Sequence, residues 1–180
     1  MSVTLKKLRS PRLSIEPADR DDMDMIADFI RSTADWYRPF LDEKDMAEHE
    51  VGEDWKVVNF KRRDFYVGRA AGIPVGTISL QYFGDYAYVG YVYLDSEHVG
   101  NGYGRQLLTF AAEVARKRGM RGVCLIAHPE ATWATKAYLK FGFEKIASDK
   151  AEVVAWNDGF LADYYEEGFE LYLYPLTEPS

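Results

Sequence analysis

The chain has 180 residues, of which 47% are hydrophobic and 28% charged, with a formal net charge of −7 at pH 7. This length suits one domain and is short for two. The negative charge argues against general nucleic-acid binding, which needs a basic surface, and no stretch approaches the ~20 consecutive apolar residues of a membrane span. We therefore expect one globular domain over residues 1–180, with neither nucleic acid nor membrane as a partner.

The first residues and the cysteine content bear on the compartment. Residues 1–11 carry basic side chains with no apolar run behind them, which does not fit a secretory signal, and we expect this segment to be flexible or loosely held. Cys124 is the only cysteine, so no internal disulfide can form, as is usual in the reducing cytoplasm. It lies in an apolar run, which favours a small core residue over an acyl-carrying nucleophile. We expect no metal site.

The N-terminal third predicts a strand followed by acidic helices. Residues 13–16 alternate in polarity and predict a strand. Residues 19–22 open a helix with acidic side chains, where the helix dipole favours them. Pro39 breaks the helical pattern, and a second, acidic helix is predicted within 42–51. The apolar stripe of the first helix has helical spacing and consists of Met23, Ile26, Ala27 and Ile30.

Much of the negative charge lies between residues 16 and 54. This segment contains fourteen Asp or Glu residues and four Lys or Arg residues. One interpretation is a set of solvated helix faces. The other is an acidic lip that attracts a cationic substrate. The sequence leaves both open.

From residue 65 the pattern changes to strands. Runs rich in Tyr, Phe and Val cover residues 65–70, 75–83 and 86–94, and turn residues separate them. They predict an antiparallel meander. The continuous apolar run 123–127 predicts a strand that is buried on both faces.

A helix over residues 104–118 connects the meander to that buried strand. A strand, a helix and a second strand form a βαβ unit, so we expect the strands 86–94 and 123–127 to be parallel. The inward face of this helix is predicted from its helical spacing as Leu107, Leu108, Ala111, Val114 and Ala115.

A second helix is predicted over 132–141, and strands over 143–146 and 169–176 complete the sheet. The fold class is therefore α/β with a mixed sheet. The inward face of the second helix is predicted to hold Ala134, Ala137, Tyr138 and Phe141.

Three glycines at alternate positions separate the meander from the first of these helices, in the segment Val99-Gly100-Asn101-Gly102-Tyr103-Gly104. Glycine allows tight turns, and a helix N-terminus offers unpaired N–H groups to phosphate. The same turn could simply form a sharp corner. Gly104-Arg105-Gln106 lacks the Gly-Lys-Ser/Thr of a nucleotide-triphosphate loop, and the dinucleotide spacing and its distal acidic residue are missing.

Two segments together resemble the GNAT superfamily of acetyl-CoA-dependent N-acetyltransferases. The stretch from Leu94 to Arg105 is similar to that family's pyrophosphate motif, Arg/Gln-x-x-Gly-x-Gly/Ala. The stretch Ala134-Thr-Lys-Ala-Tyr138-Leu-Lys140-Phe-Gly142-Phe143 is similar to its Asn-x-x-Ala-x-x-x-Tyr-x-Lys-x-Gly-Phe helix. The order of strands and helices agrees from about residue 13 to residue 176.

The resemblance implies a GNAT-like fold, in which a mostly antiparallel sheet contains a parallel strand pair that splays apart, and it implies acetyl-CoA as the cofactor. Two positions depart from the family pattern: Val99 replaces the Arg or Gln, and Ala131 replaces the Asn that contacts the pantetheine arm. The residues implied to bind the cofactor are Tyr93, Leu94, Val99, Gly100, Asn101, Gly102, Tyr103, Gly104, Arg105, Ala134 and Tyr138.

The resemblance also implies catalytic roles. A backbone N–H near Leu94 would polarise the thioester carbonyl, and Tyr138 would protonate the leaving thiolate. An alkyl ammonium must lose a proton before it attacks, which calls for a base. Strand 86–94 contains no carboxylate, so the candidates are His128 and Glu97, followed by Asp95 and Glu130.

The function implied is transfer of an acetyl group to a small-molecule or peptide amine, by direct attack in a ternary complex. Residues 23–55 and 155–168 would line the amine cleft, and their aromatic and acidic composition suits a cationic substrate. Alternatively, 155–168 is a packed hairpin in a homodimer; the chain is expected to be a monomer or a homodimer. A non-catalytic acyl-CoA sensor on the same fold is the alternative function.

Overall fold

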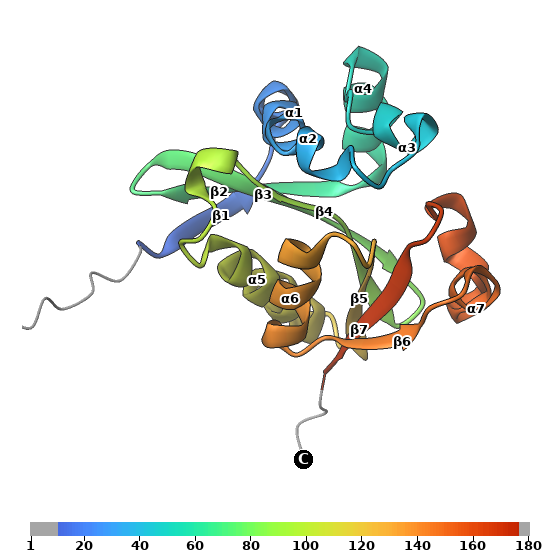
Figure 1. Cartoon of the computed structure of the whole chain (residues 1–180). Coiled ribbons are helices and arrows are strands. Elements are labelled where there is room, and N and C mark those ends of the chain that lie inside the picture. Colours follow the sequence, from blue (N-terminus) through green and yellow to red (C-terminus); the bar gives the residue numbers. More distant parts are fainter. Residues whose placement is uncertain (1–10, 177–180) are drawn as a thin grey trace, which may run out of the picture.

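The computed structural model describes residues 11–176, so nearly all of the N-terminal segment 1–11 lies outside the described residues. The chain forms one domain around a seven-stranded mixed sheet with the order β1-β2-β3-β4-β5-β7-β6 (Figure 1). The strands are β1 (Leu13–Pro17), β2 (Asp64–Ala70), β3 (Ile73–Phe83), β4 (Tyr86–Leu94), β5 (Gly122–Ala127), β6 (Glu144–Ala147) and β7 (Glu170–Pro175). This confirms the mixed α/β sheet and the parallel pairing of β4 with β5.

Helices cover both faces of the sheet. Helices α1 to α4 lie on one face, and α5 and α6 lie on the other (Figure 1). The helices are α1 (Met23–Ser32), α2 (Ala34–Tyr37), α3 (Glu43–Ala47), α4 (Glu53–Arg62), α5 (Tyr103–Lys117), α6 (Thr132–Phe141) and α7 (Lys150–Ala155), with 3-10 turns η1 (Arg20–Asp22), η2 (Ser96–His98) and η3 (Asn157–Asp163). Among the described residues, none of these helices combines the length and apolarity that a membrane crossing requires.

The side chains of β4 divide between the cores on the two faces, because successive residues of a strand point to opposite sides. Ala87 and Val89 belong to the core that α5 covers. Tyr88 belongs to the core on the other face, with Cys124 of β5 and Leu161 of η3. Cys124 is fully buried, and burial raises the pKa of its thiol, which confirms it as a core residue.

The helix faces are largely as predicted. The stripe of α1 is buried, and so are Leu107, Leu108, Ala111 and Ala115 of α5. On α6 the prediction for Ala137 is wrong: it is exposed, and Thr135 is buried in its stead. A threonine can be buried there because its hydroxyl donates to the Thr132 carbonyl of its own helix, at 3.4 Å.

The region after Pro39 contains more helix than predicted. Helix α3 lies within the predicted range 42–51, whereas α4 was not predicted. Asn59 is the residue of α4 that is buried, while Val57 and Val58 are exposed. Without a buried apolar stripe, α4 carries little of the periodic signal by which a helix is recognised in sequence.

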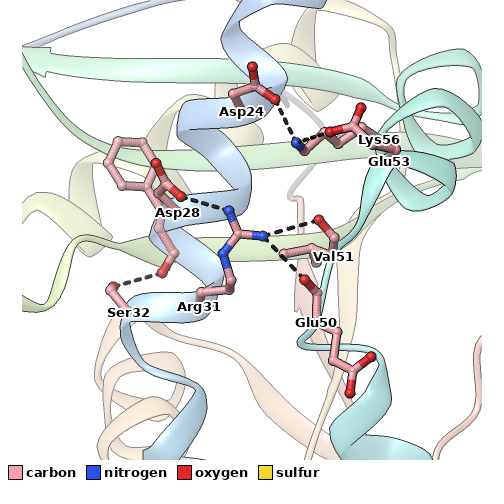
Figure 2. A network of polar contacts seen from close by, with 9 residues as sticks. Asp24, Asp28, Arg31, Ser32, Glu50, Val51, Glu53 and Lys56 are labelled. Atoms are coloured by element: carbon pink, nitrogen blue, oxygen red, sulfur yellow. Dashed lines mark hydrogen bonds and ion pairs between the residues drawn. The ribbon is translucent and has the colours of Figure 1, made fainter.

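Polar contacts fix the α3–α4 segment to α1 (Figure 2). Arg31 of α1 donates to the main-chain carbonyls of Glu50 and Val51, both at 3.2 Å. Lys56 of α4 donates to Asp24 of α1 at 2.6 Å and to Glu53 at 2.9 Å. These contacts hold the acidic α3 segment over the central strands.

Candidate functional site

The parallel strands β4 and β5 pair at one end only. Their register comprises Tyr86 with Gly122, Ala87 with Val123 and Tyr88 with Cys124. Beyond Tyr88 the two strands diverge, while β5 stays paired with β7 along its length. The splayed strand pair that the resemblance implied is therefore present.

A β-bulge in β4 accompanies the divergence. Val89 pairs with Leu80 of β3 and Val92 pairs with Ile78, so Gly90 and Tyr91 together stand opposite Ser79. The Ser79 hydroxyl accepts a hydrogen bond from the Tyr91 N–H at 2.9 Å and satisfies the irregular backbone. A bulge bends its strand and increases its twist, which turns the C-terminal half of β4 away from β5.

The open edge of β4 offers backbone donors to the gap. The Asp95 N–H donates to the Val75 carbonyl at 2.9 Å, on the β3 side. N–H groups alternate between the two edges of a strand. The N–H groups of Leu94 and Val92 therefore face the gap, where β5 no longer pairs with β4.

A cavity of about 750 Å³ opens beside this gap. Its floor consists of Tyr88 to Tyr93 of β4 and Leu125 to His128 at the end of β5. Helices α3, α4 and α6 and the segment from Ala162 to Phe169 form its walls. Among the residues that the resemblance implied for cofactor binding, Tyr93, Ala134 and Tyr138 line it.

The glycine turn lies at the N-terminus of α5. Gly102 is the N-cap residue, with φ 78°, and Gly100 has φ 92°, so both adopt a left-handed conformation that favours glycine. No side chain caps this helix. Its first backbone bond runs from the Gln106 N–H to the Gly102 carbonyl, at 3.3 Å, so the N–H groups of residues 103–105 remain available to a ligand.

Three tyrosines, Tyr37, Tyr93 and Tyr138, line the cavity. The Tyr93 hydroxyl and His49 Nε2 are 3.3 Å apart. Burial raises the pKa of Tyr37 to about 12 and raises the pKa of Tyr93 and of Tyr138 well above its ordinary value. These phenols therefore stay protonated at neutral pH and act as neutral hydrogen-bond donors.

An aromatic cluster joins α2 to α6 along one side of the cavity. The Tyr37 and Trp133 rings have centroids 5.2 Å apart, and the Trp36 and Trp133 rings 5.6 Å. Phe40 stacks on His128 at 4.6 Å. The aromatic Trp36-Tyr37 region thus packs against α6 and the end of β5.

Glu166 brings a carboxyl group into the cavity. It lies in the segment between η3 and β7, and its pKa is raised to about 8, first by burial and then by the nearby carboxylates of Asp45, Glu48 and Asp42. Glu166 in turn raises the pKa of Tyr37 and Tyr93. Within residues 11–176 no donor is hydrogen-bonded to its side chain, so its oxygens are free to accept a proton.

Some of the acidic residues between positions 16 and 54 line the cavity. Asp42, Asp45 and Glu48 line the cavity together with Glu166. Other acids of the segment lie elsewhere: Asp19 accepts a backbone N–H at the N-terminus of η1, and Asp24 pairs with Lys56. The acidic segment is therefore divided between the cavity lining and solvated helix faces.

The predicted bases differ in whether they line the cavity. His128 lines the cavity, and its Nδ1 accepts the Glu130 N–H at 3.1 Å. Glu97 lies on η2, is exposed and does not line the cavity. Asp95 caps η2, and its carboxylate accepts the Glu97 N–H at 3.4 Å. Sequence reasoning did not single out Glu166, although 155–168 was expected at the cleft.

The structure also shows where the two residues that depart from the family pattern lie. Val99 is 43% exposed, so its side chain offers only apolar surface beside the glycine turn. Ala131 is buried, lines the cavity and is the N-cap of α6 without a side-chain bond. Neither change alters the backbone donors at α5 or along β4.

Comparison with known proteins agrees with this geometry. The model of the GNAT acetyltransferase family matches residues 28–143. Among curated proteins, no sequence matches significantly.

Several solved structures share the fold. The PaiA N-acetyltransferase of Thermoplasma acidophilum, solved with coenzyme A, superposes with a TM-score of 0.72 at 17% identity, covering 91% of this chain and 99% of its own. A GCN5-related N-acetyltransferase of Rhodopseudomonas palustris has a TM-score of 0.71 at 17% identity, covering 94% and 99%. An acetyltransferase of Bacillus subtilis, also solved with CoA, has a TM-score of 0.64 at 18% identity, covering 92% and 100%.

Identities this low establish a shared architecture, whereas the family match rests on the sequence itself. That match spans more than half of the chain and includes β4, the glycine turn and α6. The protein therefore belongs to the GNAT acetyltransferase family.

Proposed function

We propose that this protein transfers the acetyl group of acetyl-CoA to the nitrogen of an amine by direct attack in a ternary complex. The observation that carries the proposal is the meeting of three groups at one cavity. These are the open edge of β4, the hydroxyl of the half-buried Tyr138 and the carboxyl of Glu166. Family membership and the CoA complexes of similar structures support the choice of donor.

The chain has groups that fit CoA. The free N–H groups of residues 103–105 suit a diphosphate, because a helix N-terminus combines unpaired donors with about half a positive charge. A Cβ at Gly100 or Gly102 would meet nothing within 4 Å, which leaves the space above the turn open. The N–H groups of Val92 and Leu94 suit the pantetheine amide and the thioester carbonyl.

Acetyl-CoA supplies the activated acetyl group; the protein must supply a neutral amine. An alkyl ammonium has a pKa near ~10, so roughly one molecule in a thousand is neutral at pH 7. Glu166 has its pKa raised to about 8, which makes it a much stronger base than an ordinary carboxylate. It accepts the ammonium proton, and the nitrogen lone pair then attacks the carbonyl carbon.

Tyr138 assists departure of the sulfur. Its hydroxyl is protonated because burial raises its pKa. Transfer of a proton from such a phenol to a solvated thiolate would be uphill. Partial burial beside the gap disfavours a thiolate as it disfavours a phenolate, so the acidities of the thiol and the phenol approach one another. The hydroxyl gives its proton to the sulfur as the C–S bond breaks, so the sulfur leaves as the thiol. The attacking nitrogen loses its second proton as the amide forms, and that proton restores the phenol.

The proposal is tested directly by release of CoA thiol from acetyl-CoA in the presence of a panel of primary amines. We expect turnover with at least one amine and a mass increase of one acetyl group on that amine. Thermal stabilisation by acetyl-CoA without turnover on any amine would instead support a non-catalytic acyl-CoA sensor.

The glycine turn is tested by Gly102→Ala. An alanine in the left-handed region costs about 1–2 kcal/mol, so the first turn of α5 should reorganise and CoA affinity should fall about 10-fold. Isothermal titration with CoA measures this. Gly72→Ala is the matched control, because Gly72 has φ 83° and equally open surroundings but lies in the β2–β3 turn. Equal affinity losses in both variants would contradict the diphosphate site.

Tyr138→Phe removes the proposed donor to sulfur. Loss of a hydrogen bond to a charged group costs about 1.5–3 kcal/mol, so kcat should fall roughly 10- to 100-fold. The Kd for CoA should stay within about twofold, since the phenyl ring keeps the packing. Tyr174→Phe on β7, outside the cavity, is the control. Equal loss of CoA binding and of turnover would exclude the role in catalysis.

Glu166→Gln tests the base. In the wild type, kcat/KM should rise with pH and level off above an apparent pKa near 8, because Glu166 is ionised only there. The glutamine variant should lose this limb and about 10²- to 10⁴-fold in rate. Rates measured from pH 6 to 9.5 decide the matter. Glu97→Gln should keep the wild-type profile; if it loses the limb instead, Glu97 is the base.

A stability measurement shows whether unfolding causes the lower rate of Glu166→Gln. The folded-state pKa of Glu166 lies above its unfolded value, so the stability tied to its protonation is full below about pH 4.3 and is lost as pH rises to 8. Glu166→Gln avoids that loss. Its unfolding free energy should therefore increase relative to wild type between pH 5 and pH 8, as denaturant titrations would measure.

A further inference from the structure

Arg63, directly after α4, places a cationic group in the same cavity. Its Nη1 is buried and has no hydrogen-bond partner. Among residues 11–176, none of the ion pairs includes Arg63. A guanidinium nitrogen that is withdrawn from water without a partner is costly, and a ligand with an anionic group would offset that cost.

The guanidinium is held rigidly in place. Its Nε donates to Asn59 Oδ1 at 3.0 Å, and Asn59 Nδ2 donates to the Trp55 carbonyl at 3.0 Å. The guanidinium carbon lies 4.7 Å from the ring centroid of Tyr91 and 5.0 Å from that of Tyr164. A fork held in this way is preorganised for a planar or tetrahedral oxyanion, because little side-chain entropy remains to be lost on binding.

The β4 bulge makes room for this arrangement. A Cβ at position 90 would overlap Nη1 of Arg63, so only glycine allows the guanidinium to approach the backbone here. Arg63 thus lies at the point where β4 turns away from β5. Tyr91, against which it packs, belongs to the α1–α4 side of the sheet, opposite α5 and the proposed diphosphate site. The anion it would bind therefore belongs to the acceptor and not to the diphosphate of CoA.

Besides the cationic Arg63, the cavity contains a group of carboxyl side chains. Glu166, Asp45 and Glu48 interact with one another, as the raised pKa of Glu166 records. Arg63 and Glu166 are both in the cavity, yet no ion pair joins them among the described residues. One region thus favours an ammonium group and a separate region favours an anion.

We propose that the acceptor is an amine that also carries an oxyanion group, a carboxylate or a phosphorus oxyacid, and that Arg63 binds this group. The inference rests on the proposed acetyl transfer and narrows its substrate class to zwitterionic amines. The ammonium end lies toward Glu166 and the oxyanion end toward Arg63. Recognition at both ends orients the nitrogen for attack at the gap between β4 and β5.

The test compares acceptors that differ only in the anionic group. The pairs are phenylalanine with 2-phenylethylamine, methionine with 3-(methylthio)propylamine, and 3-aminopropylphosphonate with propylamine. Each is assayed with acetyl-CoA, and the readout is the ratio of kcat/KM within a pair. This ratio does not depend on the folded fraction of a variant, so partial unfolding cannot imitate the result.

The wild type should prefer the anionic member of at least one pair. In Arg63→Met that preference should fall by about 10- to 100-fold, the effect of losing one charge-assisted contact. Arg63→Lys should retain part of it, because the charge remains without the planar fork. Lys61→Met removes an equal charge from an exposed position nearby and should change the ratio by less than about threefold.

The outcomes separate this inference from the proposed function. A wild type that acetylates amines but does not prefer any anionic member refutes the inference alone. An anionic preference that survives in Arg63→Met also refutes it, since another group would then bind the anion. If neither member of any pair, nor any amine of the wider panel, is acetylated, the proposed function itself fails and the inference fails with it.

Discussion

The site depends on one backbone irregularity, the β-bulge at Gly90 and Tyr91. A regular β4 would pair with β5 along its whole length and close the edge with hydrogen bonds. The bulge turns β4 away after Tyr88, which frees the N–H groups of Val92 and Leu94 and opens a gap in an otherwise continuous sheet. The same bulge places Gly90 where Arg63 can approach the backbone.

Two residues of the cavity, Glu166 and Arg63, have charge states that follow from their surroundings. Glu166 is half-buried and lies near other acids, so it holds its proton to about pH 8. Arg63 cannot lose its proton and keeps a buried, unpartnered Nη1. Two such groups are unfavourable in a folded protein without ligand. Their cost is tolerated because polar contacts hold α4 while packing holds β4 and η3, which is a common arrangement at functional sites.

Neutral hydrogen-bond donors line the same cavity. Tyr37, Tyr93 and Tyr138 line the cavity, and burial keeps all three protonated. Phenols combine a large apolar ring with a single polar atom. They can therefore exclude water from the gap and still donate a hydrogen bond at its centre. The aromatic contacts of Trp133 with Trp36 and Tyr37 extend this lining to the surface.

Local periodicity was sufficient to predict the strands from β1 to β7, helices α1, α5 and α6, and the glycine turn, because alternation and helical spacing are properties of neighbouring residues. It failed for α4, which buries almost no apolar side chain, and for Ala137. Glu97 was considered because it follows the strand 86–94, which contains no carboxylate, yet in η2 it is exposed. Glu166 and Arg63, about one hundred positions apart, acquire their proposed roles only when the tertiary fold brings both to one cavity and partly buries them. Burial and the distance between charges are set by contacts between segments distant in sequence, and no local pattern records them.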